Sequence, residues 1–343
     1  MSKKKLNICI ISIYFGKLPE WIDVWFKTAS YNDEIDFLFV TDQNITTKYN
    51  NIKILNMSFL EFKSLAIKKL DFNIKLETPY KLCDYKEVWG LILEDELKKY
   101  DYWGECDTDV VFGNLQLYFK KYQLYKYDKF GCRGHLTLYK NNNEVINRYK
   151  LSGGWFGSYK EVFKSNMIWA FDETPGINAI YQKHGFPYMD DILFGDVDVN
   201  YNDIRLVDFA CNCPPNYMQQ IFYWSNGSLL RKFVKDGKIM CDELMYIHLQ
   251  KRKMLKPDFD VDCSKEFIIT NGKFINKDFE IKLSDFEKYN NRNDNLRLKK
   301  KFGGKYKKDL RFYWLGRRLL NLKYETKQKI KKSFIYKLLK KGK

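Results

Sequence analysis

Short apolar runs separated by polar segments dominate the first sixty residues. Residues 6–14, 35–41 and 52–57 are rich in Ile, Leu, Val and Phe, and their length predicts buried β-strands rather than helices. Between the first two runs, residues 19–30 repeat apolar side chains at helical spacing. This β-α-β-β order predicts an α/β sheet, in which ligands bind beyond the carboxyl ends of the strands.

A longer helical pattern follows and leads into a pair of aspartates. Apolar side chains recur at helical spacing over residues 84–98, which predicts one amphipathic helix. The aromatic-rich residues 100–106 predict a strand that runs directly into Asp107-Thr108-Asp109, and residues 110–113 are apolar again. We therefore expect the aspartates at the carboxyl end of a strand.

Weaker patterns predict the remaining elements. Helices are expected near 143–149, 160–163 and 177–183, and strands at 205–209, 221–224 and 244–249. The polar, Asn/Asp-rich residues 256–296 show little periodicity and predict a loop-rich connection. The chain is thus divided into an α/β domain over 1–255, this connection, and a tail over 297–343.

The tail carries the whole net charge of the chain. Residues 297–343 contain 19 basic and 2 acidic residues, and this excess of 17 equals the net charge of all 343 residues. Aromatic and aliphatic side chains interleave with the cations, a pattern typical of helices that lie on an anionic membrane surface. Two alternatives are nucleic-acid binding, for which no reading motif is present, and a helix packed on the body.

The remaining composition favours a cytoplasmic protein. Lys3–Lys5 before the apolar residues 6–15 imitate a signal peptide, but no small-residue cleavage site follows. No apolar run reaches the roughly 18–20 residues that span a bilayer. The eight cysteines form no C-x-x-C pair, which indicates reduced thiols. We expect a cytoplasmic protein that is peripheral on the inner face of the membrane.

Asp107 and Asp109 are the principal candidates for chemistry. Two carboxylates two residues apart at a strand end can share one hard cation, and Mg²⁺ or Mn²⁺ keeps positions open for substrate phosphates. Such a cation offsets the charge of a leaving diphosphate. No G-x-G-x-x-G or P-loop motif occurs, which argues against dinucleotide and P-loop folds.

Five segments of the chain resemble a known class of enzyme: ISIYFG (11–16), YKLCDYK (80–86), WGECDTD (103–109), RGHLTLY (133–139) and AFDE (170–173). They are similar to GT-A-fold glycosyltransferases, and more closely to an uncharacterised bacterial family found among polysaccharide-biosynthesis genes. The resemblance covers roughly residues 6–255 and is strongest at 80–113. It implies a GT-A-like fold over 1–255 with a mixed, mainly parallel central sheet, and a D-x-D metal, Mn²⁺ or Mg²⁺. It also implies a nucleotide-sugar donor, with a UDP-sugar favoured, and a glycan or lipid-linked acceptor.

The resemblance also implies donor-binding residues. Related enzymes carry an Asp on the helix before the D-x-D strand, with a basic residue one turn on; Asp84 matches the first, and Lys86 is one position early. Tyr14 and Thr108 complete the candidates on this side of the site. Asp84 equally suits a helix N-cap, and both roles can hold at once.

His248 resembles a late metal ligand of the glycogenin-like group. In that group a His completes the metal coordination and a Lys close behind it contacts the diphosphate, so His248 with Lys251 or Lys253 fits the arrangement. A structural histidine at a strand end is the alternative. His135 and His184 show no partner in the sequence.

Asp172 and Glu173 are candidates for acceptor binding or for a general base. An inverting transferase needs a carboxylate near the acceptor hydroxyl, whereas a retaining one does not. An exposed turn before Pro175-Gly176 is the alternative, and it is favoured for either residue taken alone.

Three functions follow from these residues. A metal-dependent glycosyltransferase uses the D-x-D and His248 together. A metal-dependent nuclease or nucleotidyltransferase, recruited to nucleic acid by the tail, would need a Gly-Ser helix start or a third acidic residue followed by Lys, and neither is evident. A binding module without catalysis would not require Asp107, Asp109 and His248 together. The first function is favoured.

Overall fold

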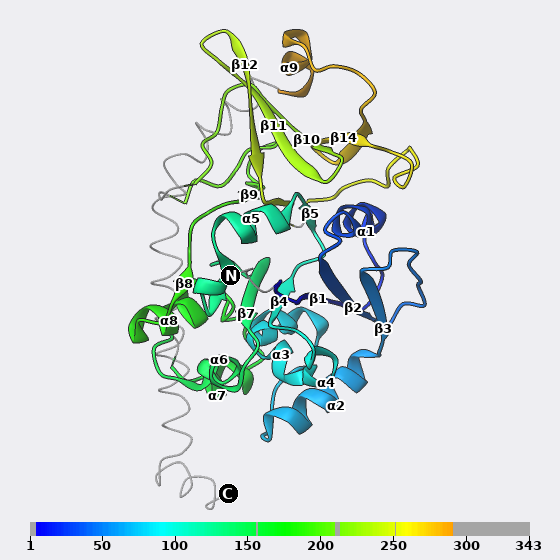
Figure 1. Ribbon diagram of the computed structural model, residues 1–343. Coiled ribbons are helices and arrows are strands. Elements are labelled where there is room, and N and C mark those ends of the chain that lie inside the picture. The colour runs from blue at the N-terminus through cyan, green and yellow to red at the C-terminus, as the bar shows by residue number, and fades with distance from the viewer. Residues whose placement is uncertain (1–4, 156, 210–212, 251, 291–343) are drawn as a thin grey trace, which may run out of the picture. The chain divides into compact units, whose positions relative to one another are not determined.

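A seven-stranded sheet forms the centre of the protein (Figure 1). The computed structural model describes residues 5–155, 157–209, 213–250 and 252–290. The sheet order is β3-β2-β1-β4-β7-β6-β8, with β1 to β4 mutually parallel, β7 antiparallel to both neighbours, and β6 parallel to β8. Its strands are β1 (Ile8–Tyr14), β2 (Ile35–Thr41), β3 (Ile52–Asn56), β4 (Tyr102–Cys106), β6 (Lys129–Phe130), β7 (Leu136–Lys140) and β8 (Tyr188–Met189). The predicted α/β class with a mixed, mainly parallel sheet is confirmed.

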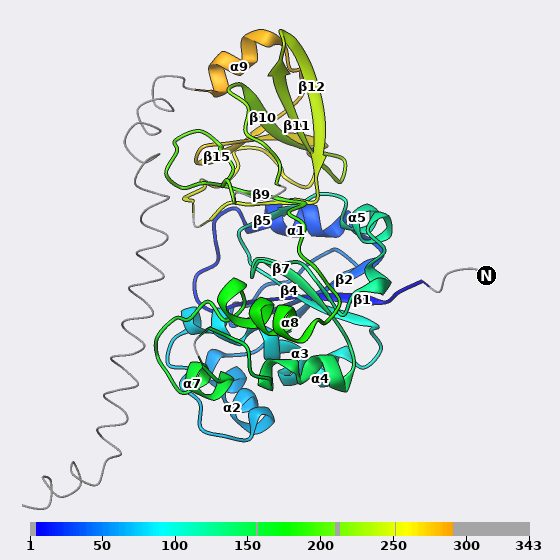
Figure 2. The same ribbon diagram turned by 90° about the vertical axis from the view of Figure 1, so that its left-hand side faces the viewer.

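Helices cover both faces of this sheet. Figure 2 shows α2 (Phe59–Leu70), α3 (Trp89–Ile92) and α4 (Glu94–Leu97) on one face and α1 (Ile22–Ser30) on the other. Trp25 of α1 is fully buried and packs on Phe37, Phe39 and Phe112. The apolar face expected for residues 19–30 is therefore the face that closes this part of the core.

The single helix predicted for residues 84–98 is wrong. The segment begins earlier, as the 3-10 helix η1 (Pro79–Val88), and then breaks into α3 and α4. Tertiary contacts explain the break. Asp84 accepts hydrogen bonds from the distant backbone N–H groups of Trp169 and Phe171, and Gly90 lies so close to Trp103 that a Cβ there would be 2.2 Å from the indole ring.

A second, three-stranded sheet orders the segment after the aspartates. β5 (Val110–Phe112) pairs antiparallel with β13 (Tyr246–His248), and β13 pairs parallel with β9 (Gly195–Asp196). The backbone N–H of Phe112 donates a hydrogen bond to the hydroxyl of Thr28 in α1 at 3.2 Å, which ties this small sheet to α1. Three distant parts of the sequence thus meet beside the end of β4.

A third, antiparallel sheet follows, with order β12-β11-β10-β14-β15. Its strands are β10 (Gln220–Ser225), β11 (Ser228–Lys235), β12 (Lys238–Leu244), β14 (Glu266–Thr270) and β15 (Lys273–Asn276), and α9 (Leu283–Tyr289) packs on one face through Phe286. The loop-rich prediction is therefore wrong for residues 266–289. The strand predicted at 205–209 is reduced to one bridge between Val197 and Leu206.

The other elements are short. They are α5 (Leu115–Lys121), η2 (Leu124–Lys126), α6 (Asn143–Ile146), η3 (Arg148–Lys150), α7 (Tyr159–Phe163), η4 (Thr174–Asn178) and α8 (Ala179–His184). Within the described ranges, no helix is both long and apolar enough to cross a bilayer, and the seven cysteines found there are free thiols. The predicted tail over 297–343 lies outside the described residues.

Candidate metal centre

The D-x-D segment lies where β4 ends, as the sequence predicts. β4 is the middle strand of the central sheet, and Asp107-Thr108-Asp109 connect it to β5. The backbone of Asp107 is fixed on both sides, because its N–H donates to His135 O at 3.2 Å and its carbonyl accepts from the Trp25 indole at 3.2 Å. The side chains of Asp107 and Asp109 remain 36% and 22% exposed, so both carboxylates can reach a ligand from solvent.

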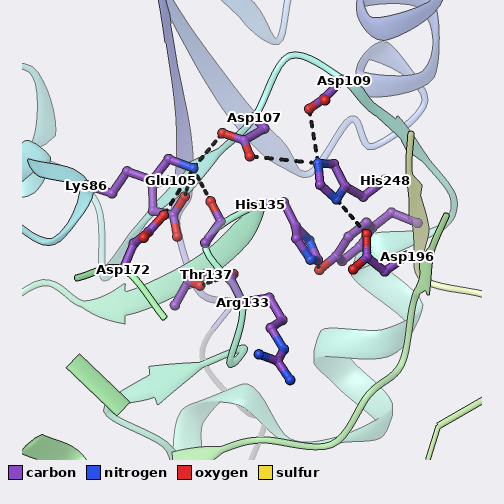
Figure 3. A network of polar contacts seen from close by, with 12 residues as sticks. Lys86, Glu105, Asp107, Asp109, Arg133, His135, Thr137, Asp172, Asp196 and His248 are labelled. Atoms are coloured by element: carbon purple, nitrogen blue, oxygen red, sulfur yellow. Dashed lines mark hydrogen bonds and ion pairs between the residues drawn. The ribbon is translucent and has the colours of Figure 1, made fainter. Parts of the chain in front are cut away.

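His248 completes a three-residue cluster with these aspartates (Figure 3). Its Nε2 lies 3.3 Å from Oδ1 of Asp109 and 4.0 Å from Oδ2 of Asp107. One ligand atom from each residue lies within 4.8 Å of the other two. Two carboxylates and one imidazole suit Mn²⁺ or Mg²⁺ and leave coordination positions for phosphate oxygens. The residues therefore fit the divalent cation expected from the sequence.

Asp196 holds the opposite side of the His248 ring. Its Oδ1 lies 2.8 Å from Nδ1 of His248, and the Asp196 side chain is only 7% exposed. Burial by itself lowers the pKa of His248, but the carboxylates of Asp109 and Asp196 outweigh burial and raise that pKa to about 10. Without a metal, the imidazole is therefore the cation that offsets this group of acids.

His135 covers one face of the same ring. The two imidazole centroids are 4.3 Å apart with their planes 20° apart, and Nδ1 of His135 lies 3.0 Å from the hydroxyl of Tyr246. Burial, followed by the charges of His248 and Lys86, lowers the pKa of His135 well below its usual value, so this ring is neutral. His135, Asp196 and His248 also form a cluster of ligand atoms. Ring nitrogens donate their lone pairs in the ring plane, so two stacked rings converge poorly on one ion, and the D-x-D set is the better site.

Lys86 is a buried cation directly behind the D-x-D. Its Nζ lies 2.5 Å from Oδ1 of Asp107 and 3.6 Å from both Oε2 of Glu105 and Oδ2 of Asp172, and it donates to the carbonyl of Gly134. Burial lowers the pKa of Lys86, but Asp107, Glu105 and Asp172 outweigh it and raise that pKa well above its usual value. Lys86 is therefore charged, and it connects Asp107 with Asp172.

Asp172 is buried beside Lys86 instead of lying in an exposed turn. Its side chain is 8% exposed, and burial raises its pKa well above the usual value although Lys86 opposes the shift. Glu173 is more open and has Arg133 at 3.8 Å. The exposed-turn alternative is thus wrong for Asp172. Its carboxylate and that of Asp107 in the D-x-D contact the same lysine, Lys86.

Asp84 is fully buried and binds the backbone of the segment that precedes Asp172. Its carboxylate accepts hydrogen bonds from the backbone N–H groups of Trp169 and Phe171 and from Nζ of Lys81 at 2.7 Å. The N-cap of η1 is Thr78, so the helix-cap interpretation of Asp84 is wrong. Asp84 instead fixes the backbone that leads into Asp172, and its contact with a donor sugar stays a prediction.

Most of the chain matches the model of one protein family. The model described as "Family of unknown function (DUF6625)" matches residues 10–278. The chain belongs to this family. The matched range contains Asp107, Asp109, Asp196 and His248, so the whole cluster lies inside the DUF6625 region. No curated protein matches the sequence.

Solved glycosyltransferases are among the structural neighbours of this DUF6625 member. The galactosyltransferase LgtC, in complex with donor and acceptor sugar analogues, is 11% identical with a TM-score of 0.33, over 55% of this chain and 75% of its own. GlyE of Streptococcus pneumoniae TIGR4 is 9% identical with a TM-score of 0.32, over 54% of this chain and 45% of its own. At these values the likeness carries no argument about activity, which has to come from the site.

The remaining predicted donor residues lie at the edges of the cluster in this DUF6625 member. Tyr14 ends β1, and burial, followed by the charge of Asp109, raises its pKa. Thr108 is buried between the two aspartates. Lys253 is exposed, and Lys251 lies outside the described residues. Their contacts with a donor stay predictions.

Asp196 and the role of His135 beside His248 are not predictable from local sequence patterns. Asp196 belongs to a two-residue strand, which is too short to show a pattern, and it lies 52 residues before its partner His248. The RGHLTLY segment contains His135, but nothing local indicates that its ring stacks on another histidine. Both residues become visible only through the pairing of strands.

Proposed function

We propose that this protein is a metal-dependent glycosyltransferase that moves a sugar from a nucleotide-sugar to a glycan or lipid-linked acceptor in surface polysaccharide synthesis. The observation that carries the proposal is the convergence of Asp107, Asp109 and Nε2 of His248 at the carboxyl end of β4. These residues would hold Mn²⁺ or Mg²⁺, which offsets the charge that develops on a leaving diphosphate.

The residues around this centre suit a sugar diphosphate donor, with a UDP-sugar favoured. Thr108 lies between the two aspartates in the sequence, Tyr14 is the last residue of β1, and Lys253 is exposed and follows His248 in the chain. On the other side, Asp172 offers a hydrogen-bond partner to sugar hydroxyls, and the charged Lys86 holds this side chain and that of Asp107 in place. Asp172 and Glu173 are also the candidates for a general base, should the reaction invert the anomeric centre.

We assign the reaction to residues 1–255 and membrane attachment to the basic tail over 297–343. The tail's excess of 17 positive charges and its interleaved aromatic residues support binding to the anionic inner face of the cell membrane, where lipid-linked acceptors are located. A nuclease or nucleotidyltransferase is not favoured, because the neighbouring carboxylate of Asp196 faces the other nitrogen of His248 rather than the D-x-D.

A thermal-shift screen of UDP-, GDP-, CMP- and dTDP-sugars, each with and without Mn²⁺, tests the proposal. A ligand that binds only the folded protein raises the melting temperature. We expect one nucleotide-sugar to raise it only when Mn²⁺ is present, and that donor then to be hydrolysed slowly. Stabilisation by none of the four nucleotide classes, with or without Mn²⁺, would contradict the proposal.

A further inference from the structure

One carboxylate beside the candidate metal centre faces away from the metal. Asp196 contacts Nδ1 of His248 at 2.8 Å, whereas Nε2 of the same ring faces the aspartates of the D-x-D. The three residues able to share a cation on the Nε2 side are Asp107, Asp109 and His248, and Asp196 is not among them. Its contribution must therefore pass through the histidine.

Sheet pairing, rather than a loop, fixes this contact. Asp196 and His248 are directly paired residues of the parallel strands β9 and β13. The adjoining backbone is also bonded, because the N–H of Val197 donates to the carbonyl of His248 at 2.9 Å. On its other side β13 is bonded to β5, where His248 pairs with Val110 directly after the D-x-D. Strand pairing thus fixes the positions of Asp196, His248 and the D-x-D relative to one another.

The chemistry of this contact selects one form of the imidazole. A carboxylate only accepts hydrogen bonds, so the neutral His248 ring must carry its hydrogen on Nδ1 to satisfy Asp196. Nε2 then presents its lone pair toward Asp107 and Asp109, which is the form a metal ligand requires. With the hydrogen on Nε2 instead, the ring would present an N–H group to the cation and could not bind it.

His135 restricts the same ring in a second way. Its imidazole stacks on His248 at 4.3 Å, and the Tyr246 hydroxyl at its Nδ1 keeps His135 itself in place. Asp196 therefore sets the protonated nitrogen of His248, and His135 limits rotation of its ring plane. Few orientations remain besides the one in which Nε2 faces the D-x-D.

We propose that Asp196 is a positioning residue of the metal centre, which holds His248 in the tautomer and orientation that binds a divalent cation. The inference rests on the proposed function only in taking the D-x-D and His248 as a metal site; it does not depend on which group is transferred. Carboxylates behind a ligating histidine typically contribute about 10- to 100-fold to metal affinity.

The test is Mn²⁺ binding to the full-length protein carrying Asp196→Asn. The asparagine has nearly the same shape, but its amide N–H₂ can donate to Nδ1 and so stabilise the tautomer that cannot bind metal. We expect the dissociation constant for Mn²⁺ alone, measured by titration with detection of free Mn²⁺ by electron paramagnetic resonance, to rise by about 10- to 100-fold. Transfer by the variant should recover when Mn²⁺ is saturating, because the reacting groups are unchanged.

Asp198→Asn is the matched control. Asp198 follows Asp196 by two residues, and its side chain bonds to the backbone and side-chain nitrogens of Asn200, not to His248. This variant should bind Mn²⁺ like the wild type, and melting temperatures without metal show whether either substitution disturbs folding. Should Asp196→Asn fail to fold, Asp196→Glu, which keeps the accepting group, provides the second comparison, and its Mn²⁺ affinity should exceed that of Asp196→Ala.

The outcomes separate this inference from the proposed function. Weak Mn²⁺ binding by folded Asp196→Asn supports the inference, even if no nucleotide-sugar is ever turned over. Wild-type Mn²⁺ affinity in both Asp196→Asn and Asp196→Ala overturns the inference and leaves the glycosyltransferase proposal standing, because alanine, unlike asparagine, cannot accept a hydrogen bond from Nδ1. Absence of Mn²⁺ binding to the wild-type protein overturns the inference as well.

Discussion

The imidazole of His135 lies against that of His248, with centroids 4.3 Å apart and planes 20° apart. The two rings differ in charge, because burial lowers the pKa of His135 well below its usual value while the surrounding acids raise that of His248 to about 10. A neutral ring can pack on a charged one at little electrostatic cost, whereas two charged rings would repel each other. The difference in charge is thus a condition for the packing that orients His248.

Replacing either aspartate of the D-x-D should abolish transfer while the fold stays intact. In Asp107→Asn and Asp109→Asn the shape is kept, but the charge that holds the cation is lost, and with it the stabilisation of the leaving diphosphate. We expect transfer to fall by at least about 100-fold in each variant. The melting temperature without metal should change little in Asp109→Asn, whose side chain is partly exposed, and should fall in Asp107→Asn, because Asp107 is one of the carboxylates that offset the buried charge of Lys86. Metal-dependent activity near the wild-type level in both variants would rule out this role.

Mn²⁺ binding should tighten as pH rises. Without metal, the pKa of His248 is about 10, so at neutral pH a proton occupies the nitrogen that the metal requires and must be displaced. The apparent affinity should therefore increase, by at most about tenfold per pH unit, between about pH 6.5 and 8.5, with release of about one proton per cation. Calorimetric titration in buffers of different ionisation enthalpy measures both quantities.

His248→Gln is the control for this pH dependence, because glutamine has no titrating group in the range. Its Mn²⁺ affinity should be weak and nearly independent of pH, and an unchanged slope would contradict the assignment.

The raised pKa of His248 also makes the stability of the metal-free protein depend on pH. Since the folded pKa of His248 exceeds the usual value of 6.5, its contribution is fully present below about pH 6.5 and is lost as pH rises toward 10.

Local patterns predicted the central strands and the two aspartates, because both signals are contained in a few consecutive residues. The helix α2 was not predicted, although a local signal marks its N-terminus. Ser58 and Glu61 form a capping box, in which the side chain of each bonds to the backbone of the other. Such a start signal, S-x-x-E, can be found by sequence alone. The buried side chains of this helix, Phe62, Ala66 and Leu70, also recur every four residues, so the helical period is present in the sequence as well.

Tertiary contacts decided what local patterns could not. The amphipathic pattern after Asp84 predicts one helix, but that carboxylate is used to bind the backbone of Trp169 and Phe171, and the segment breaks. The site shows the same limit. His248 was found through a resemblance, whereas Asp196 enters through the register of two strands that are far apart in the sequence.

Deleting residues 297–343 should release the protein from anionic membranes and leave donor hydrolysis largely unaffected. The deleted segment carries an excess of 17 positive charges, equal to the net charge of the chain. Ionic attraction is screened by salt and the burial of apolar side chains is not, so binding of the full-length protein should weaken with salt without vanishing. Co-sedimentation with neutral and anionic vesicles, at low and high salt, measures this. Equal binding of the full-length and truncated proteins to anionic vesicles would refute the assignment.

Gly134 lies directly against the side chain of Asp172. A Cβ at this position would lie 1.9 Å from Oδ2 of Asp172, a carboxylate that is itself buried beside Lys86. Gly134→Ala should therefore displace Asp172, lower the free energy of unfolding by about 1–3 kcal/mol, and reduce transfer more than Mn²⁺ binding. Denaturant titration and transfer assays at saturating Mn²⁺ measure the two effects.

Gly154→Ala and a double variant give this last prediction its controls. A Cβ at Gly154 would meet its nearest neighbour, the carbonyl of Pro175, at an ordinary 3.6 Å, so that substitution should be tolerated. If the collision with Asp172 causes the loss of stability, Gly134→Ala should cost much less in a protein that already carries Asp172→Gly, because the clashing side chain is gone. If Gly134→Ala lowers the free energy of unfolding equally in both backgrounds, the collision with Asp172 is not the cause of the lost stability.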